Sequence, residues 1–146
     1  ETFRSLLMDP KSEYLAHMYL LGRDGGVPLV LSDHGESTAA HPEDAGRWAD
    51  AFERPDLRAG IRFHNTLHGN PQRMLFEADG FMVFARGDSG IVAVNKTCEW
   101  QTPSFRTSGL RDGRYRCQIH GHELELAGSS FTLRIPPAEA QLWLHV

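Results

Sequence analysis

The sequence predicts two structural classes in succession, an α/β segment followed by an all-β segment. Before residue 70, two helical patterns flank one short apolar run, whereas after residue 70 short alternating runs are separated by turn dipeptides. The charge changes at the same point, since residues 1–70 hold 7 basic and 11 acidic side chains and residues 71–146 hold 8 of each. We therefore divide the chain into residues 1–70 and 71–146.

The first part is predicted to fold as helix, strand and helix. Asp9 and Pro10 are typical of an N-cap and a first helical residue, and the helix is expected over Ser12–Leu21. The run Val27–Ser32 is continuously apolar, which favours a strand of a parallel sheet buried on both faces. A second helix is predicted over Pro55–Leu67. Because one strand cannot complete a parallel sheet, we expect chain outside these 146 residues to cover this part.

The second part is predicted to be an antiparallel sandwich. Its alternating runs recur at the spacing of about 8–12 residues that such folds show. Because each run has its own alternation, we expect residues 71–146 to fold without residues 1–70. The eight predicted strands are Arg73–Glu77, Phe81–Arg86, Ile91–Asn95, Trp100–Phe105, Gly113–Ile119, Glu123–Leu126, Ser130–Ile135 and Gln141–His145.

The composition excludes several classes of protein. The chain has 146 residues, 40% hydrophobic and 23% charged, with a formal net charge of −4. These values disfavour intrinsic disorder and a basic nucleic-acid-binding surface. The longest apolar run is far shorter than the ~20 residues of a membrane helix. We therefore predict a soluble chain with no nucleic-acid or membrane partner.

Two histidine pairs are candidates for a metal site, and neither is favoured. His120 and His122 flank Gly121, which indicates a hairpin turn with both rings in water. His64 and His68 lie at i, i+4 on the second predicted helix, but the HExxH motif is absent. We therefore predict no metal site. The sequence also has no Ser/His/Asp or Cys/His arrangement at a spacing that would indicate a self-contained active site.

Trp100 and Trp143 leave a second function open. Each lies in an alternating run, which favours the core or edge of the sandwich. The alternative is a platform that stacks on sugars, in a carbohydrate-binding or interaction module without catalysis. Solvent exposure discriminates the two, because a platform needs exposed rings.

The order of the segments resembles the C-terminal part of an α-amylase, in the α-amylase family of retaining glycoside hydrolases. The helix Tyr14–Leu21 resembles the seventh helix of that family's (β/α)8 TIM barrel, Val27–Ser32 its eighth strand, and Asp56–Leu67 its eighth helix. The second part is similar to the family's C-terminal Greek-key β-sandwich. The stretches that carry this similarity are Gly90–Lys96, Gly109–Tyr115 and Phe131–Val146.

The resemblance implies that the chain is one part of a secreted enzyme that hydrolyses α-1,4-glucosidic bonds in starch-like glucans with retention. All three catalytic carboxylates would lie upstream of residue 1, so this segment alone is expected to be inactive. Barrel enzymes build their sites where the strands end, so Ser32, Asp33 and His34, with Arg4 and Phe3, are expected to face the substrate. The partners are then the α-glucan and the upstream barrel. The segment itself would hold no cofactor, and any calcium of the parent enzyme would be bound upstream.

A secreted parent would also allow a disulfide between Cys98 and Cys117, which follow or lie in predicted strands of the sandwich. The bond would close a loop of about 20 residues and stabilise the fold by roughly 3 kcal/mol. A third interpretation is a small interaction protein in which residues 1–70 wrap the sandwich and no enzyme is involved.

Overall fold

The computed structural model describes residues 9–30 and 49–146. Two helices come first, α1 (Pro10–Gly22) and α2 (Pro55–Thr66). The carboxylate of Asp9 accepts hydrogen bonds from the backbone N–H groups of Lys11 and Ser12, both at 3.0 Å, which confirms it as the N-cap of α1. Both helices match their predicted positions to within two residues.

Eight strands follow, and each overlaps a predicted one, although the strand predicted over Trp100–Phe105 begins only at Ser104 and the one predicted over Ser130–Ile135 ends at Thr132. They form a six-stranded antiparallel sheet, in the order β1-β2-β3-β8-β5-β6, and a two-stranded sheet of β4 and β7. Because β8 lies between β3 and β5, strands far apart in the sequence are hydrogen-bonded to each other. The strands are β1 (Gln72–Ala78), β2 (Phe81–Arg86), β3 (Gly90–Asn95), β4 (Ser104–Arg106), β5 (Gly113–Cys117), β6 (Glu123–Leu126), β7 (Ser130–Thr132) and β8 (Glu139–His145).

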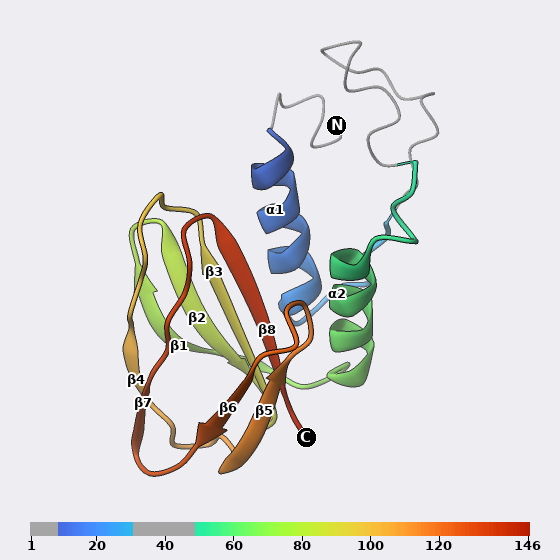
Figure 1. Ribbon diagram of the computed structural model, residues 1–146. Helices are drawn as coiled ribbons and strands as arrows, with labels where there is room; N and C mark the ends of the chain where they lie inside the picture. The colour runs from blue at the N-terminus through green and yellow to red at the C-terminus, as the bar shows by residue number, and fades with distance from the viewer. Residues whose placement is uncertain (1–8, 31–48) are drawn as a thin grey trace.

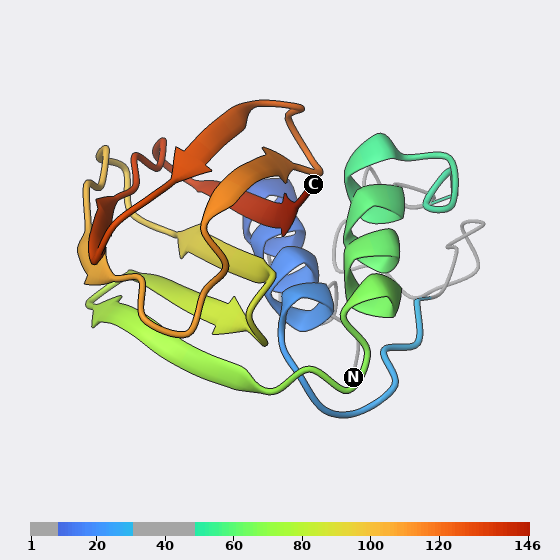
Figure 2. The same cartoon turned by 90° about the horizontal axis from the view of Figure 1, so that it is seen from below.

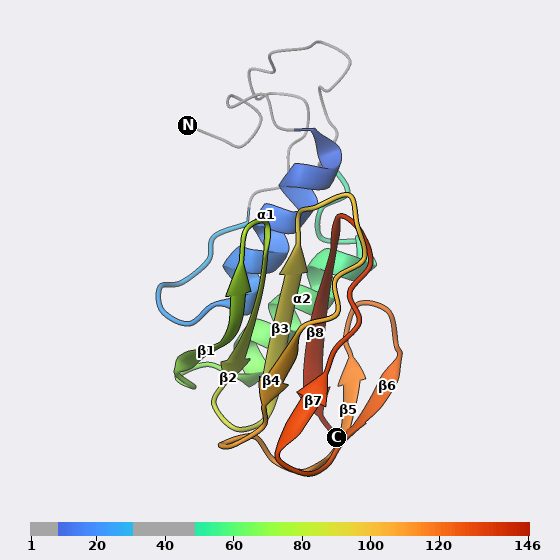
Figure 3. The same ribbon diagram turned by 90° about the vertical axis from the view of Figure 1, so that its left-hand side faces the viewer.

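The elements form three layers. Figure 1 shows the two helices on one side of the six-stranded sheet, and Figure 3, seen from the other side, shows β4 and β7 in front of it. The end-on view of Figure 2 shows α1 next to the sheet and α2 farther out. Helix α1 packs against β3 and β8, and α2 packs against α1 and β8.

The three layers enclose two hydrophobic cores, one on each face of the six-stranded sheet. Strand β3 is buried along its whole length because its side chains alternate between the two cores. The helix-side core is lined by Tyr14, Leu15, Met18, Leu21, Ala51, Leu57, Phe63, Leu67, Phe84, Val92, Val94, Ala140 and Leu142. The core under the two-stranded sheet is lined by Val83, Ile91, Ala93, Phe105, Tyr115, Cys117, Leu126, Leu133, Ile135 and Trp143.

The predicted parallel strand Val27–Ser32 is not seen in its described part. Residues 27–30 have no strand assignment, and the side chains of Val27 and Leu29 are 88% and 82% exposed. Residues 31 and 32 lie outside the described residues. Within the described residues 27–30, no strand neighbour pairs with this run and one side of it, with Val27 and Leu29, is uncovered, so the barrel end stays a prediction.

Helix α1 is only partly covered, as expected from its wide apolar surface. Tyr14, Leu15, Met18 and Leu21 are buried, whereas Ala16, Tyr19 and Leu20 are half-buried. Neither helix of the described residues is long and apolar enough to cross a membrane.

Candidate functional site

The residues predicted to face a substrate all lie outside the described part of the chain. Ser32, Asp33 and His34 fall within residues 31–48, and Arg4 and Phe3 within residues 1–8. Their predicted role at the rim of a cleft stays a prediction. The described residues instead show what holds the helices to the β-strands and which surfaces remain exposed.

Arg86, at the end of β2, is the largest fully buried side chain among the described residues, with 1% of its surface exposed. Its guanidinium donates to the carbonyl oxygens of Gly22 and Arg23, at 2.6 and 2.5 Å, and so caps the end of α1. The same group donates to the carbonyl oxygen of Leu67 at 2.9 Å, after α2, and to that of Asn70 at 3.1 Å. One cation thus satisfies backbone acceptors that the helix ends leave without partners.

The charge of Arg86 suits this position at two helix ends. Burial lowers the pKa of the guanidinium, and the nearby carboxylate of Asp24 offsets part of that shift. An arginine pKa starts so high that the side chain remains charged. Arg86 was not predicted as a buried residue, although it is a cation that ends the otherwise apolar run of β2.

A second polar contact joins α1 to β8. The hydroxyl of Tyr14 donates to Oε1 of Glu139 at 2.5 Å, and Nζ of Lys11 lies 3.7 Å from Oε2 of the same carboxylate. Burial, followed by the hydrogen bond to Glu139, raises the pKa of Tyr14. These groups line a shallow cavity of about 420 Å³ between the start of α1, the start of α2 and β8.

His120 also contributes to this contact: the residue is exposed at its turn, as predicted, but one ring nitrogen faces β8 and its side chain is only 28% exposed. Nε2 of His120 lies 3.2 Å from the carbonyl oxygen of Ala140 and 3.5 Å from Oε1 of Glu139. The turn itself is as expected, since Gly121 has φ = 73° and its N–H donates to the carbonyl oxygen of Cys117. The rings of His120 and His122 lie 6.0 Å apart.

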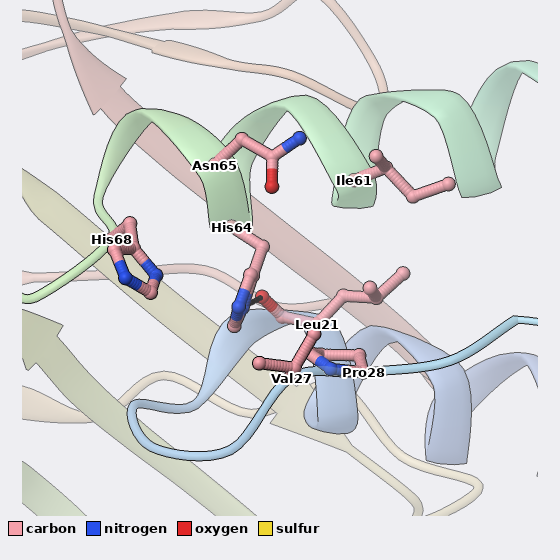
Figure 4. A pocket seen from close by; sticks show the side chains of 7 residues that line it. All are labelled: Leu21, Val27, Pro28, Ile61, His64, Asn65 and His68. Atoms are coloured by element: carbon pink, nitrogen blue, oxygen red, sulfur yellow. Dashed lines mark hydrogen bonds between the residues drawn. The ribbon is translucent and has the colours of Figure 1, made fainter.

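The second histidine pair lines a small pocket between the ends of the helices (Figure 4). His64 is buried, and its Nδ1 lies 3.2 Å from the carbonyl oxygen of Leu21, to which it donates in the tautomer that carries this proton. The pocket, of about 210 Å³, is lined on its other side by Val27 and Pro28. Over residues 9–30 and 49–146, no group of three or more His, Cys, Asp or Glu side chains is placed to hold a metal ion.

The two tryptophans of the β-strand region differ in their surroundings. Trp143 is 5% exposed in the core, and its Nε1 donates to Oε1 of Gln141 at 3.1 Å, so its predicted core position is confirmed. Trp100 is 53% exposed, and the guanidinium carbon of Arg134 lies 4.4 Å from its ring centroid. By the exposure criterion, only Trp100 is placed to act as a platform.

The predicted disulfide between Cys98 and Cys117 is wrong for this structure, because both cysteines are free. Ile91 in β3 lies opposite Trp143 in β8, which in turn lies opposite Cys117. At ~3.3 Å per residue, Asn95 is already about 13 Å further along β3, and Cys98 comes after it. A disulfide needs Cα atoms within ~7 Å. The error came from placing two cysteines on neighbouring strands without their register.

The fold is an antiparallel β domain of two sheets, with a layer of two helices on the outer face of the larger sheet. Residues 76–146 match the family model "Alpha amylase, C-terminal all-beta domain". This part of the chain belongs to that family, as the resemblance predicted. The match begins inside β1, so it includes seven whole strands and leaves out both helices.

Relatives named α-amylase support the same assignment. The chain is 46% identical over 99 residues to an α-amylase of Aeromonas hydrophila, which covers 68% of this chain and 20% of the relative. It is 29% identical over 157 positions to an α-amylase of Thermomonospora curvata, covering 90% of this chain and 25% of the relative. The chain thus spans between a fifth and a quarter of these relatives.

Solved structures share the fold. The crystal structure of an α-amylase from Geobacillus thermoleovorans, complexed with acarbose, superposes with a TM-score of 0.64 at 18% identity. It covers 92% of this chain, so the likeness includes described residues of the helix layer, and 33% of that chain.

Proposed function

We propose that the chain is the C-terminal part of a secreted α-amylase-type glycoside hydrolase that cleaves α-1,4-glucosidic bonds in starch-like glucans with retention. The observation that carries this proposal is the family match of residues 76–146, together with 46% identity to a protein named α-amylase. A fold relative complexed with acarbose supports an α-glucan as the substrate class.

In this proposal residues 1–70 are the end of the (β/α)8 barrel. Helices α1 and α2 are its last two helices, and Val27–Ser32 is its eighth strand. The exposure of Val27 and Leu29 supports this role, because both lie on one side of a single apolar run, which neighbouring barrel strands would cover. Arg86 and Tyr14 then hold the barrel's last helices against the β domain.

Ser32, Asp33, His34 and Arg4 form part of the cleft rim in this proposal and have no catalytic role. Retention needs two carboxyl groups ~5–5.5 Å apart across the scissile bond. We assign these groups, and any calcium ion of the parent enzyme, to the part of the protein outside this chain. The segment contributes scaffold and substrate contacts.

A chimera tests the proposal. The corresponding C-terminal part of the Aeromonas hydrophila α-amylase is replaced by residues 1–146, and soluble starch is the substrate. We expect hydrolysis by the chimera, with the α-anomer as the first product by NMR, and no hydrolysis by the 146-residue chain alone. Activity of the isolated chain, or a folded but inactive chimera, would overturn the assignment.

Two variants of the chimera test the cleft rim. Asp33→Asn and Arg4→Gln are expected to raise KM severalfold and to leave kcat within about twofold, since contacts made equally to substrate and transition state change KM alone. A 1,000-fold fall in kcat for Asp33→Asn would instead indicate a role in the chemical step.

A further inference from the structure

The two-stranded sheet carries an exposed polar strip that the scaffold role does not use. Backbone hydrogen bonds extend this sheet beyond β4 and β7 in the same register. Gln101 and Ile135 exchange two backbone hydrogen bonds, at 3.0 and 2.9 Å, and the N–H of Leu133 donates to the carbonyl oxygen of Pro103 at 3.0 Å. Residues 100–106 therefore run antiparallel to residues 130–136. At ~3.3 Å per residue, this ribbon is about 20 Å long.

One face of this ribbon is buried and the other is exposed, in strict alternation. Phe105, Leu133 and Ile135 point into the core, on the side of the six-stranded sheet. The opposite face looks away from the helices (Figure 3). Its exposed residues, which we call the outer strip, are Trp100, Thr102, Ser104, Arg106, Ser130, Thr132 and Arg134.

The backbone on both sides of Trp100, at one end of the outer strip, is held by hydrogen bonds. The turn before it is tied down by buried Asn95, whose Nδ2 donates to the carbonyl oxygens of Glu99 and Pro136, both at 2.8 Å. On the other side, Gln101 is fixed by its two hydrogen bonds to Ile135. Arg134 covers one face of the indole, so the exposed half of Trp100 lies on its other face and edges. A preorganised aromatic surface loses little conformational entropy when a ligand binds.

The chemistry of the outer strip favours a neutral, polyhydroxylated chain. It combines one indole, four hydroxyl groups and two guanidinium groups, with no carboxylate. Hydroxyl groups both donate and accept hydrogen bonds, as do those of a sugar, and Ser104 and Thr132 already share one at 2.6 Å. Only two cations lie on the strip and the chain has a net charge of −4, so a polyanion would find little charge to bind.

We propose that the outer strip binds an α-1,4-glucan chain, with a glucose ring stacked on the indole of Trp100 and its hydroxyls bonded along the strip. The choice of an α-glucan rests on the proposed function, whereas the strip itself rests on the geometry above. Such a surface would hold a polysaccharide beside the enzyme without taking part in bond cleavage.

The test uses the 146-residue chain in native gels that contain amylopectin. We expect the mobility of the wild type to be retarded, and Trp100→Ala to lose at least tenfold in affinity, which corresponds to about 1.4 kcal/mol. Trp100→Phe, which keeps an aromatic ring, is expected to retain part of the binding. Phe52→Ala is the matched control, because Phe52 is 55% exposed just before α2, in the helix layer.

Three results would overturn the proposal: no retardation of the wild type, equal retardation of Trp100→Ala, or retardation by heparin in place of amylopectin. Thermal unfolding of each variant establishes that it is folded. Failure of the proposed function is a separate result, because it is measured as hydrolysis of soluble starch by the chimera, whereas binding is measured as the gel mobility of the 146-residue chain. If the chimera is inactive but the 146-residue chain still binds amylopectin, the proposed function is wrong and the binding site on the outer strip is supported.

Discussion

Each face of the six-stranded sheet packs on a hydrophobic core, but different interactions hold the two faces to their neighbours. On the helix face, buried polar groups reach across the layers: Arg86 caps both helices, and Glu139 accepts a hydrogen bond from Tyr14. On the other face, neutral amides make the contacts across the layers: buried Asn95 donates to the carbonyl oxygen of Pro136 at 2.8 Å, and Gln141 donates to that of Arg134 at 3.0 Å. The helix layer therefore depends on a buried cation and a carboxylate, whereas the second sheet is held by neutral hydrogen bonds.

The largest expected effect comes from removing the helix layer. Without residues 1–70, Phe84, Val92, Val94 and Leu142 lose the cover of α1 and α2. Burying one such side chain stabilises by ~1.5–3 kcal/mol, so the loss is on the order of 10 kcal/mol, comparable to a domain's whole stability. We expect residues 71–146 alone to show no cooperative thermal transition by circular dichroism.

This expectation reverses the one drawn from alternation alone, which had residues 71–146 folding without the rest. A sharp transition of that piece, within a few degrees of the full chain, would show that the helix face does not need its cover.

The same contrast explains what the sequence predicted and what it did not. The strand positions followed from local alternation and turn residues, so they needed no knowledge of the neighbours. The apolar runs Val27–Val30 and Ile91–Val94 look alike, yet the first has Val27 and Leu29 exposed, whereas the second is a central strand buried throughout. Contacts between residues far apart in the sequence decide which apolar run is buried on both faces. A local sequence pattern holds no information on such contacts.

The side-chain contacts were the least predictable part. The helix caps are local and were predicted at Asp9, whereas the partners of Arg86 come from residues 16 to 64 positions away. The disulfide failed for the same reason, because it depends on strand register. The candidate rim residues followed from the resemblance alone and lie outside the described residues.

Arg86→Met is expected to have the next largest effect. The substitution leaves the carbonyl oxygens of Gly22, Arg23, Leu67 and Asn70 without this donor, and the cost is about 3–5 kcal/mol of unfolding free energy in urea titrations. Arg62→Met, at an exposed position of α2, is the matched control and should change stability by less than ~0.5 kcal/mol. Equal effects of the two variants would mean that the helix ends do not depend on Arg86.

Alkaline pH should weaken both faces through their tyrosines. Burial and then the hydrogen bond to Glu139 raise the pKa of Tyr14, and burial raises the pKa of Tyr115 to about 12. Tyrosines of the unfolded chain ionise near pH 10, so the contribution is complete below pH ~10 and is lost as the pH rises above it. Each group steepens the fall of the unfolding free energy by up to ~1.4 kcal/mol per pH unit.

Urea titrations at pH 8, 10 and 11 measure this slope. Tyr14→Phe and Tyr115→Phe should each flatten it, because each removes one group that must stay neutral in the folded chain. A slope that Tyr14→Phe leaves unchanged would contradict the burial of its hydroxyl against Glu139.

Two glycines sharpen the comparison within the helix layer. A Cβ on Gly22 would lie 2.8 Å from Cγ1 of Val92, whose branched side chain is stiff in β3, whereas a Cβ on Gly60 would lie 2.7 Å from Cδ1 of Leu21, the flexible end of its side chain. We expect Gly22→Ala to cost about 1–3 kcal/mol by overpacking. Gly60→Ala should cost less, because it gains ~1 kcal/mol of helix propensity inside α2. The reverse order in urea titrations would mean that α1 is not pressed against β3 at Gly22.

The smallest expected effect concerns the two cysteines, which differ in solvent exposure. Cys98 is exposed after β3, whereas Cys117 is buried in the core under the second sheet, and burial raises the pKa of its thiol. Because the thiolate is the reactive form, a disulfide reagent should titrate one thiol rapidly in the native chain and the second only after unfolding. Cys98→Ser should remove the rapid phase and change the unfolding free energy by less than ~0.5 kcal/mol, as expected for an exposed side chain. Detection of no thiol at all in the unfolded, unreduced chain would restore the disulfide that the register of β3, β8 and β5 excludes.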